Sequence, residues 1–252
     1  MTLPMRRALG WLIALLVVAP ARSAPAQEWE NFAFVEDGFE ANFPGRPAVD
    51  NIIWVTQHGY ELPARIYRAS RGAERYSATV VDYRGIEKLG VERAAHCHPQ
   101  AEPCLGTSDG ADGAIMGLGY WKMDVRGALA HATQKFLQRE GTVTHYSLQF
   151  QQVVEGYLLR MTNPDESQTM AYITMHANRL YVFEGTTPKG APIRPILQSS
   201  IGFLDADGNS IRYLDYYSNA IHGLRQQAPP PATRERSGAL VGAEKGNRPA
   251  GR

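Results

Sequence analysis

The stretch that decides the fold is Thr142–Thr186, TVTHYSLQFQQVVEGYLLRMTNPDESQTMAYITMHANRLYVFEGT. Four segments within it alternate apolar, aromatic or β-branched residues with polar ones: Thr142–Phe150, Tyr157–Thr162, Met170–His176 and Leu180–Glu184. A period of two is typical of strands that bury one face. Because the connections between the segments are short and polar, consecutive segments are expected to pair. The sequence therefore predicts an antiparallel meander of four strands.

Two connections of this meander contain residues that favour turns. Asn163-Pro164-Asp165-Glu166 combines the fixed φ of proline with side chains that bond their own backbone. Ala177-Asn178 places a residue that tolerates the left-handed region at the tip of a hairpin. Both turns support the pairing of neighbouring segments.

A second group of strands is predicted in the first half of the chain. Its members share the same alternation, and they are Gly38–Phe43, Ile52–Thr56, Tyr60–Ala69 and Arg75–Tyr83. Pro44-Gly45 ends the first of them, because it offers the fixed φ and the positive φ that a type II turn needs. The four strands follow one another in hairpin order.

Helical spacing predicts two helices between the strand groups, over Ile86–Ala95 and Asp124–Glu140. Asp124 is expected to accept hydrogen bonds from the free N–H groups at the start of its helix. An insertion of about residues 96–123, rich in glycine, separates the two helices.

The end of the body is predicted to contain one more helix and one more strand. The helix is expected over Ala191–Phe203, with Pro192 and Pro195 in its first turns, where their missing N–H groups are tolerated. A last hairpin or strand is expected from Phe203-Leu204-Asp205, Asp207-Gly208-Asn209 and Ile211–Tyr217. Together these elements predict an α+β domain, an antiparallel sheet of about seven to nine strands covered by two or three helices.

Two short motifs carry a resemblance to a known fold. Phe39-x-x-x-Phe43-Pro44-Gly45-x-Pro47, followed by a strand, a turn and Tyr76-x-x-x-Val80-x-Asp82-Tyr83, resembles the opening of exported proteins with the PsbP-like fold. That superfamily includes the extrinsic PsbP subunit of photosystem II and a Ran-binding nucleotide-release factor. The order of elements over about residues 32–217 is similar as well, apart from the insertion. The resemblance implies a fold and no active site, because members of the superfamily share no catalytic residues.

The first 26 residues indicate a secretory signal. Arg6 and Arg7 precede the apolar run Ala8–Ala19, and Ala24-Pro25-Ala26 has the small-x-small form of a cleavage site. Cleavage is expected after Ala26, since a cut after Ala24 would leave the proline ring beside the scissile bond. The alternative is an uncleaved membrane anchor, but the apolar run is shorter than the roughly 20 residues that span a bilayer. We expect a periplasmic or secreted protein with no transmembrane segment after signal removal.

Charge divides the remaining chain into a body and a tail. Residues 27–218 carry 17 Lys and Arg against 23 Asp and Glu, whereas residues 219–252 carry six against two. The tail contains Pro229-Pro230-Pro231, several glycines and few large apolar residues, so it is predicted to be disordered. An acidic body argues against nucleic acid as a partner. The body is predicted to be a single domain.

The sharpest cluster of potential ligands is His96, Cys97, His98 and Cys104. Two thiolates and two imidazoles within nine residues match copper or zinc. The chain has only these two cysteines, they lie seven positions apart in a loop broken by proline, and the chain is expected to be exported. This arrangement favours a Cys97–Cys104 disulfide, and metal binding and redox activity remain the alternatives.

Other candidate sites have a simpler structural explanation. Asp205-x-Asp207-x-Asn209 has the first three positions of a calcium loop but lacks its later glycine and glutamate, so a hairpin turn is favoured. No serine-hydrolase, zinc-protease or P-loop motif occurs. His145 and His176 fall on strands of the meander, and a cleft that joins either one to an acidic residue would indicate an enzyme. Seven aromatic residues at strand spacing fit either the core or a ligand groove, and the core explains most of them: Trp54, Tyr60, Tyr67, Tyr146, Tyr157, Tyr172 and Tyr181.

No catalytic residue and no cofactor are therefore predicted. We expect a non-catalytic exported accessory or binding protein that docks on a membrane or envelope complex by its sheet face or its glycine-rich insertion. The alternatives are a periplasmic metal-handling protein that uses His96, Cys97, His98 and Cys104, and an enzyme with an undeclared site.

Overall fold

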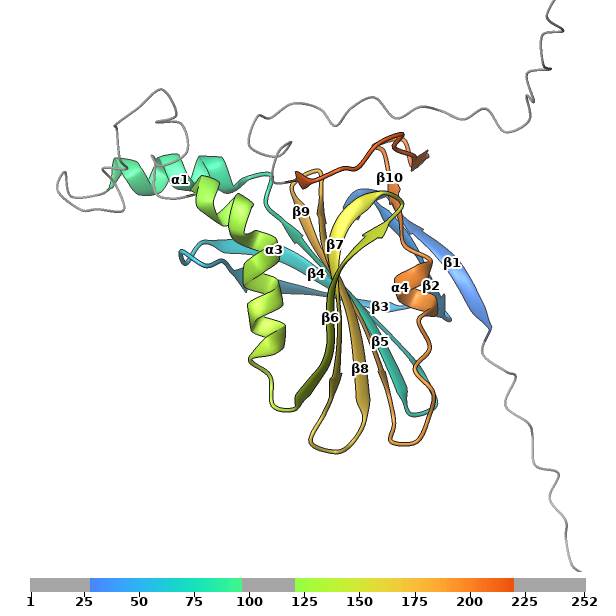
Figure 1. Cartoon of the computed structure of the whole chain (residues 1–252). Coiled ribbons are helices and arrows are strands. Elements are labelled where there is room, and N and C mark those ends of the chain that lie inside the picture. Colours follow the sequence, from blue (N-terminus) through green and yellow to red (C-terminus); the bar gives the residue numbers. More distant parts are fainter. Residues whose placement is uncertain (1–27, 97–120, 220–252) are drawn as a thin grey trace, which may run out of the picture.

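The computed structural model describes residues 28–96 and 121–219 (Figure 1). The first strand group and its helix comprise β1 (Trp29–Phe34), the 3-10 turn η1 (Val35–Asp37), β2 (Phe39–Pro44), β3 (Ala48–Val55), β4 (Glu61–Arg71), β5 (Glu74–Asp82) and α1 (Ile86–Ala95). The second part comprises α3 (Trp121–Leu137), β6 (Thr142–Gln151), β7 (Val154–Thr162), β8 (Gln168–His176), β9 (Arg179–Thr187), α4 (Ile196–Ser199), β10 (Gly202–Leu204) and β11 (Ser210–Ile211). None of the helices in these two ranges is long and apolar enough to cross a membrane.

Seven strands form one antiparallel sheet in the order β3-β4-β5-β9-β8-β7-β6. The predicted meander is its second half, because β6, β7, β8 and β9 each pair with the next strand in sequence. The two strand groups meet where β5 pairs with β9, with Tyr76 opposite Gly185. The predicted α+β fold with a sheet of seven to nine antiparallel strands is confirmed.

A second sheet of four short strands, in the order β1-β2-β10-β11, was not predicted as a separate unit. β1 and β2 form a hairpin around η1, and β10 then pairs with β2 through Phe203 and Phe39. That pair joins residues far apart in sequence. The motif Asp205-x-Asp207-x-Asn209 before β11 forms the expected turn. The carboxylate of Asp205 accepts a hydrogen bond from the backbone N–H of Asn209 at 2.8 Å.

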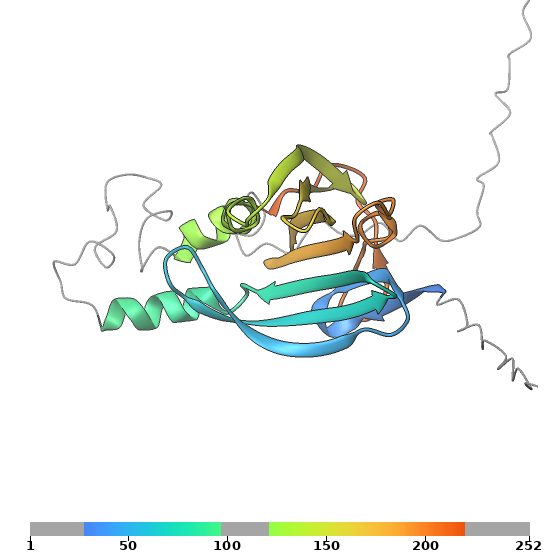
Figure 2. The same cartoon turned by 90° about the horizontal axis from the view of Figure 1, so that it is seen from below.

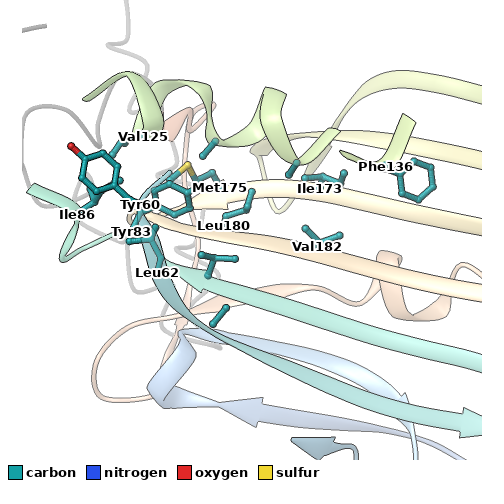
Figure 3. Close-up of a cluster of buried hydrophobic side chains, with 14 of the residues drawn as sticks. Tyr60, Leu62, Tyr83, Ile86, Val125, Phe136, Ile173, Met175, Leu180 and Val182 are labelled. Atoms are coloured by element: carbon teal, nitrogen blue, oxygen red, sulfur yellow. The ribbon is translucent and has the colours of Figure 1, made fainter. Parts of the chain in front are cut away.

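The two faces of the large sheet are covered by different elements. α3 packs on one face against β8 and β9, while α4 and the small sheet cover the other (Figures 1 and 2). The α3 side has a mixed aliphatic and aromatic core that includes Phe136, Ile173 and Val182 (Figure 3). The other side has an aromatic core that includes Phe39, Tyr181, Phe183, Phe203 and Tyr217.

Two hairpin turns differ in how well the sequence predicted them. Ala177 and Asn178 have φ of 47° and 57°, which confirms the predicted tight hairpin. Gln152 and Val153 have φ of 50° and 66° without any typical turn residue, and Val153 is β-branched, which makes this conformation unusual. The backbone N–H of Tyr217 donates to the Val153 carbonyl at 3.0 Å. Tertiary contacts therefore support this turn, and β7 starts three residues earlier than predicted.

The predicted helix over Ala191–Phe203 is wrong over most of its length. Only Ile196–Ser199 is helical, and Gly202 already pairs with Glu40 in the small sheet. Residues before a proline are held out of the helical region, so Pro192 and Pro195 keep the preceding chain extended. Within the predicted segment Ile211–Tyr217, only Ile211 lies in a strand, since β11 comprises Ser210 and Ile211. β11 pairs with β10 through Ile211 and Phe203, so the predicted last hairpin is present in a shorter form.

A buried carboxylate joins the small sheet to the large one. Asp37, at the end of η1, is 6% exposed and accepts from Arg65 Nη2 at 2.5 Å and from the Tyr67 hydroxyl. The Tyr181 hydroxyl donates to the main-chain carbonyl of Asp37 at 2.7 Å. Burial, reinforced by the Asp37 carboxylate, raises the pKa of Tyr67. Asp37 therefore connects η1 to both β4 and β9.

We predict that Asp37→Ala lowers the free energy of unfolding by about 2–4 kcal/mol, because it leaves the half-buried Arg65 guanidinium and the Tyr67 hydroxyl without their acceptor. Urea denaturation followed by circular dichroism measures the loss. Glu36→Ala is the matched control, since Glu36 also pairs with Arg65 but its side chain is 79% exposed. The free energy of unfolding of this control should fall much less. Equal losses in the two variants would contradict a special role for Asp37.

Candidate functional site

The predicted cysteine loop lies largely outside the described residues. Cys97, His98 and Cys104 are not among them, so the Cys97–Cys104 disulfide and the metal alternative stay predictions. His96 is described, is exposed, and has its Nδ1 2.8 Å from the carbonyl of Glu92 one helical turn earlier. Within residues 28–96 and 121–219, no group of three or more His, Cys, Asp or Glu side chains is arranged to hold a metal ion.

The structure keeps His145 and His176 apart. His145 lies opposite Arg160 on β7, and Arg160 lies opposite Met170 on β8. Met170 is six residues from His176, a separation of about 20 Å along the strand. His145 is exposed and sits 2.8 Å from the Ser147 hydroxyl, whereas His176 is buried. The two histidines do not form a shared site.

His176 belongs to the aromatic core. Its ring stacks on Phe203 with 4.3 Å between centroids, and its Nε2 lies 2.7 Å from the Tyr213 hydroxyl. Burial lowers the pKa of His176 to about 3. The side chain is therefore neutral at ordinary pH and helps to attach the segment after β11.

Asp124 does not act as the predicted helix cap. Its buried carboxylate accepts from the Thr56 hydroxyl at 3.0 Å and from the His58 backbone N–H at 3.1 Å, and it lies 3.1 Å from His58 Nδ1. Arg93 of α1 donates to the carbonyl of the same His58 at 2.8 Å. These contacts attach the β3–β4 hairpin to both helices. The local sequence could not show this, because the hairpin residues are more than 60 positions from Asp124.

Two adjoining cavities form a large hollow surface on the α3 side of the large sheet. One, of about 390 Å³, lies between the C-terminal half of α3 and strands β3, β4, β5 and β9. The other, of about 420 Å³, continues along β4, β5 and β9. Ser77 and Glu184 line both cavities, so the two form one groove. We call this surface the sheet groove.

The shape of the sheet groove follows from side-chain size. β5 contributes the short side chains of Ser77 and Thr79 to its floor, while Trp54 and Ile66 stand on one side and Phe136 on the other. In an alternating strand these residues all point to the same face. The hollow is therefore a strip of small side chains between larger apolar ones.

Positively charged side chains lie around the groove. Lys135 places its Nζ 4.3 Å from the centroid of the Trp54 ring. Arg139 forms a bidentate pair with Glu184, with N–O distances of 2.7 and 2.8 Å. Arg68 and Arg75 line the far end of the groove. The cationic side chains thus outnumber the single carboxylate in the lining of the two cavities.

Sequence reasoning found only part of this surface. Trp54 was recognised as a possible groove residue, whereas most of the aromatics considered with it, such as Tyr67, Tyr172 and Tyr181, are buried in the core. No sequence pattern identifies Lys135, Arg139 and Glu184 as parts of one surface. They come from segments that meet only in the folded chain.

Comparison with known proteins gives no function for this chain. No protein family and no curated protein matches the sequence. Solved structures to which the chain is similar include the solution structure of cyanobacterial PsbP (CyanoP) from Synechocystis sp. PCC 6803, at 12% identity and a TM-score of 0.37. That match covers 74% of this chain and 98% of the other. A superposition this loose carries no argument about activity or partners.

We predict that lowering the pH from 7 to 5 removes about 2 kcal/mol of stability through His176 alone. The imidazole of the unfolded chain takes up a proton near pH 6.5, whereas the buried one stays neutral until about pH 3. Stability is therefore complete above the unfolded pKa and falls as the pH drops below it. Urea denaturation at both pH values measures this loss.

His176→Phe should reduce the loss between pH 7 and pH 5 by that amount. His145→Phe is the control, because His145 is exposed, and it should keep the wild-type dependence. A His176→Phe variant with an unchanged pH dependence would show that His176 titrates normally in the folded protein.

Proposed function

We propose that this protein is a non-catalytic exported accessory or binding protein whose partner docks in the sheet groove beside α3. The supporting observation is the groove itself, where a floor of short side chains between larger apolar ones is left open next to a single helix. Grooves with apolar linings and a few convergent polar groups are the usual form of binding sites.

The lining indicates the chemistry of the partner. The half-buried side chains of Ile52, Trp54 and Ile66 favour an apolar segment, and tryptophan often anchors interfaces. Lys135, Arg139 and the two arginines at the far end favour acidic groups beside that segment. We therefore expect a partner with an apolar stretch flanked by acidic residues.

The His–Asp contact near the groove has a structural explanation. Asp124 uses its two carboxylate oxygens for the Thr56 hydroxyl and for the backbone and ring of His58. These bonds hold the hairpin in place, which supports a binding function over catalysis for this part of the molecule.

Site-specific photocrosslinking in cells tests the proposal. A photoreactive phenylalanine analogue at Ser77 would sit in both cavities and should yield a discrete crosslinked product in the envelope fraction, which mass spectrometry then identifies. The same analogue at Ile53 is the matched control, because Ile53 is 63% exposed on β3 but points to the opposite face from Trp54. The control should not yield that product.

Charge reversal at the rim adds a second criterion. Lys135→Glu should reduce the yield of the Ser77 product about tenfold, since acidic groups of the partner would then be repelled. Lys88→Glu, the same change on the exposed side of α1, should leave the yield unchanged. Identical products from Ser77 and Ile53, or no product from Ser77, would refute docking in the groove.

A further inference from the structure

The outer edge of the large sheet formed by β6 differs from an ordinary edge strand. β6 is an end strand and pairs only with β7 among the described residues (Figure 1). Its ten residues include no Lys, Arg, Asp, Glu or Pro. The opposite edge, β3, carries Asp50 in an ion pair with Arg68. Natural edge strands usually carry charges or proline that prevent pairing with another chain.

β6 also exposes a row of large apolar side chains. Tyr146 and Leu148 are each 51% exposed and Phe150 is 38% exposed. Tyr146 lies opposite Leu159 and Leu148 opposite Tyr157, so the row is on the α3 side of the sheet. Tyr216, 69% exposed, extends the row through a ring contact with Phe150 at 4.6 Å.

We propose that β6 pairs antiparallel with β6 of a second copy of this chain, around a two-fold axis at Leu148. In this register Tyr146 faces Phe150 of the other copy, and Leu148 faces Leu148. All three apolar positions then overlap on one face, and Ser147 and Gln149 pair on the other. The inference is independent of the sheet groove, which lies on the far side of α3.

Backbone and charge both permit this pairing. In an antiparallel ladder every second residue directs its N–H and C=O away from its neighbour, so the outer side of β6 offers these groups to a new strand. Because the strand has no charged residue, two copies meet without repulsion between like charges. The bulge between Val143 and His145 lies outside the overlapping residues and limits the paired length.

The surface area agrees with a small symmetric interface. Large apolar side chains carry about 150–250 Å² each, so the four exposed ones contribute on the order of 400 Å² per copy. The backbone edge and the polar side chains of β6 bring the total for two copies to about 1,200 Å², at the lower limit of specific interfaces. An isologous contact of this kind closes after two copies, so it produces a dimer and no larger assembly.

Sedimentation velocity on protein purified from cells that produce the full chain tests the proposal, at about 100 μM, well above a micromolar Kd. We expect a dimer for the wild type. Leu148→Lys should raise the dimer Kd at least about 100-fold, because each lysine meets its own copy at the axis. Ile53→Lys is the matched control on the opposite edge, where an isoleucine that is 63% exposed changes to lysine, and it should remain dimeric.

Mixing two variants gives the sharpest result. Leu148→Lys and Leu148→Glu should each be monomeric alone and should form a heterodimer together, since residue 148 faces itself only in the proposed register. Circular dichroism of each variant verifies that it is folded. A monomeric wild type at this concentration, a larger oligomer, or a mixture that stays monomeric would overturn the proposal. A monomeric wild type would instead favour pairing of the β6 edge with a strand from another protein.

Discussion

The carboxylate of Asp37 determines how the two sheets fit together. A charged group buried to this extent is costly unless donors surround it, and here Arg65 and the Tyr67 hydroxyl bind the side chain while the Tyr181 hydroxyl binds the carbonyl of the same residue. The donors come from β4 and β9, which are both interior strands of the large sheet. The hydrogen bonds that Asp37 accepts therefore fix the position of η1. They also fix the hairpin of β1 and β2, which η1 connects. The aromatic core then fills the space between the sheets.

On the other face of the large sheet, the helix that covers it is much narrower than the sheet. A helix with its side chains is about 10 Å wide, whereas seven strands spaced about 4.8 Å apart span roughly 30 Å. α3 packs on β8 and β9, near the middle of the sheet. It leaves β3, β4 and β5 partly open on one side and β6 on the other. The sheet groove and the apolar row of β6 are the two consequences of covering a wide sheet with one helix, and both proposed interactions use surface that this helix leaves exposed.

The similarity to cyanobacterial PsbP says nothing about these surfaces. It is at 12% identity, so neither the residues that line the groove nor the uncharged edge of β6 can be inferred from it. The function of a fold depends on its local side chains. In this chain these are the short residues of β5, the cations of α3 and the arginines near the ends of β4 and β5. They define the partner chemistry that we propose.

The sequence by itself determined the strands of the meander, the hairpin at Ala177-Asn178 and the extent of α1, because alternation, helical spacing and turn chemistry act between near neighbours in the chain. Only the tertiary structure decided that Gln152-Val153 is a turn, that α4 is confined to Ile196–Ser199, and that Asp124 binds a hairpin instead of capping its helix. The sequence also did not predict the sheet groove, apart from Trp54 as a possible groove residue. In each case the deciding partners are distant in sequence, and contacts of that kind leave no periodic pattern in a single chain.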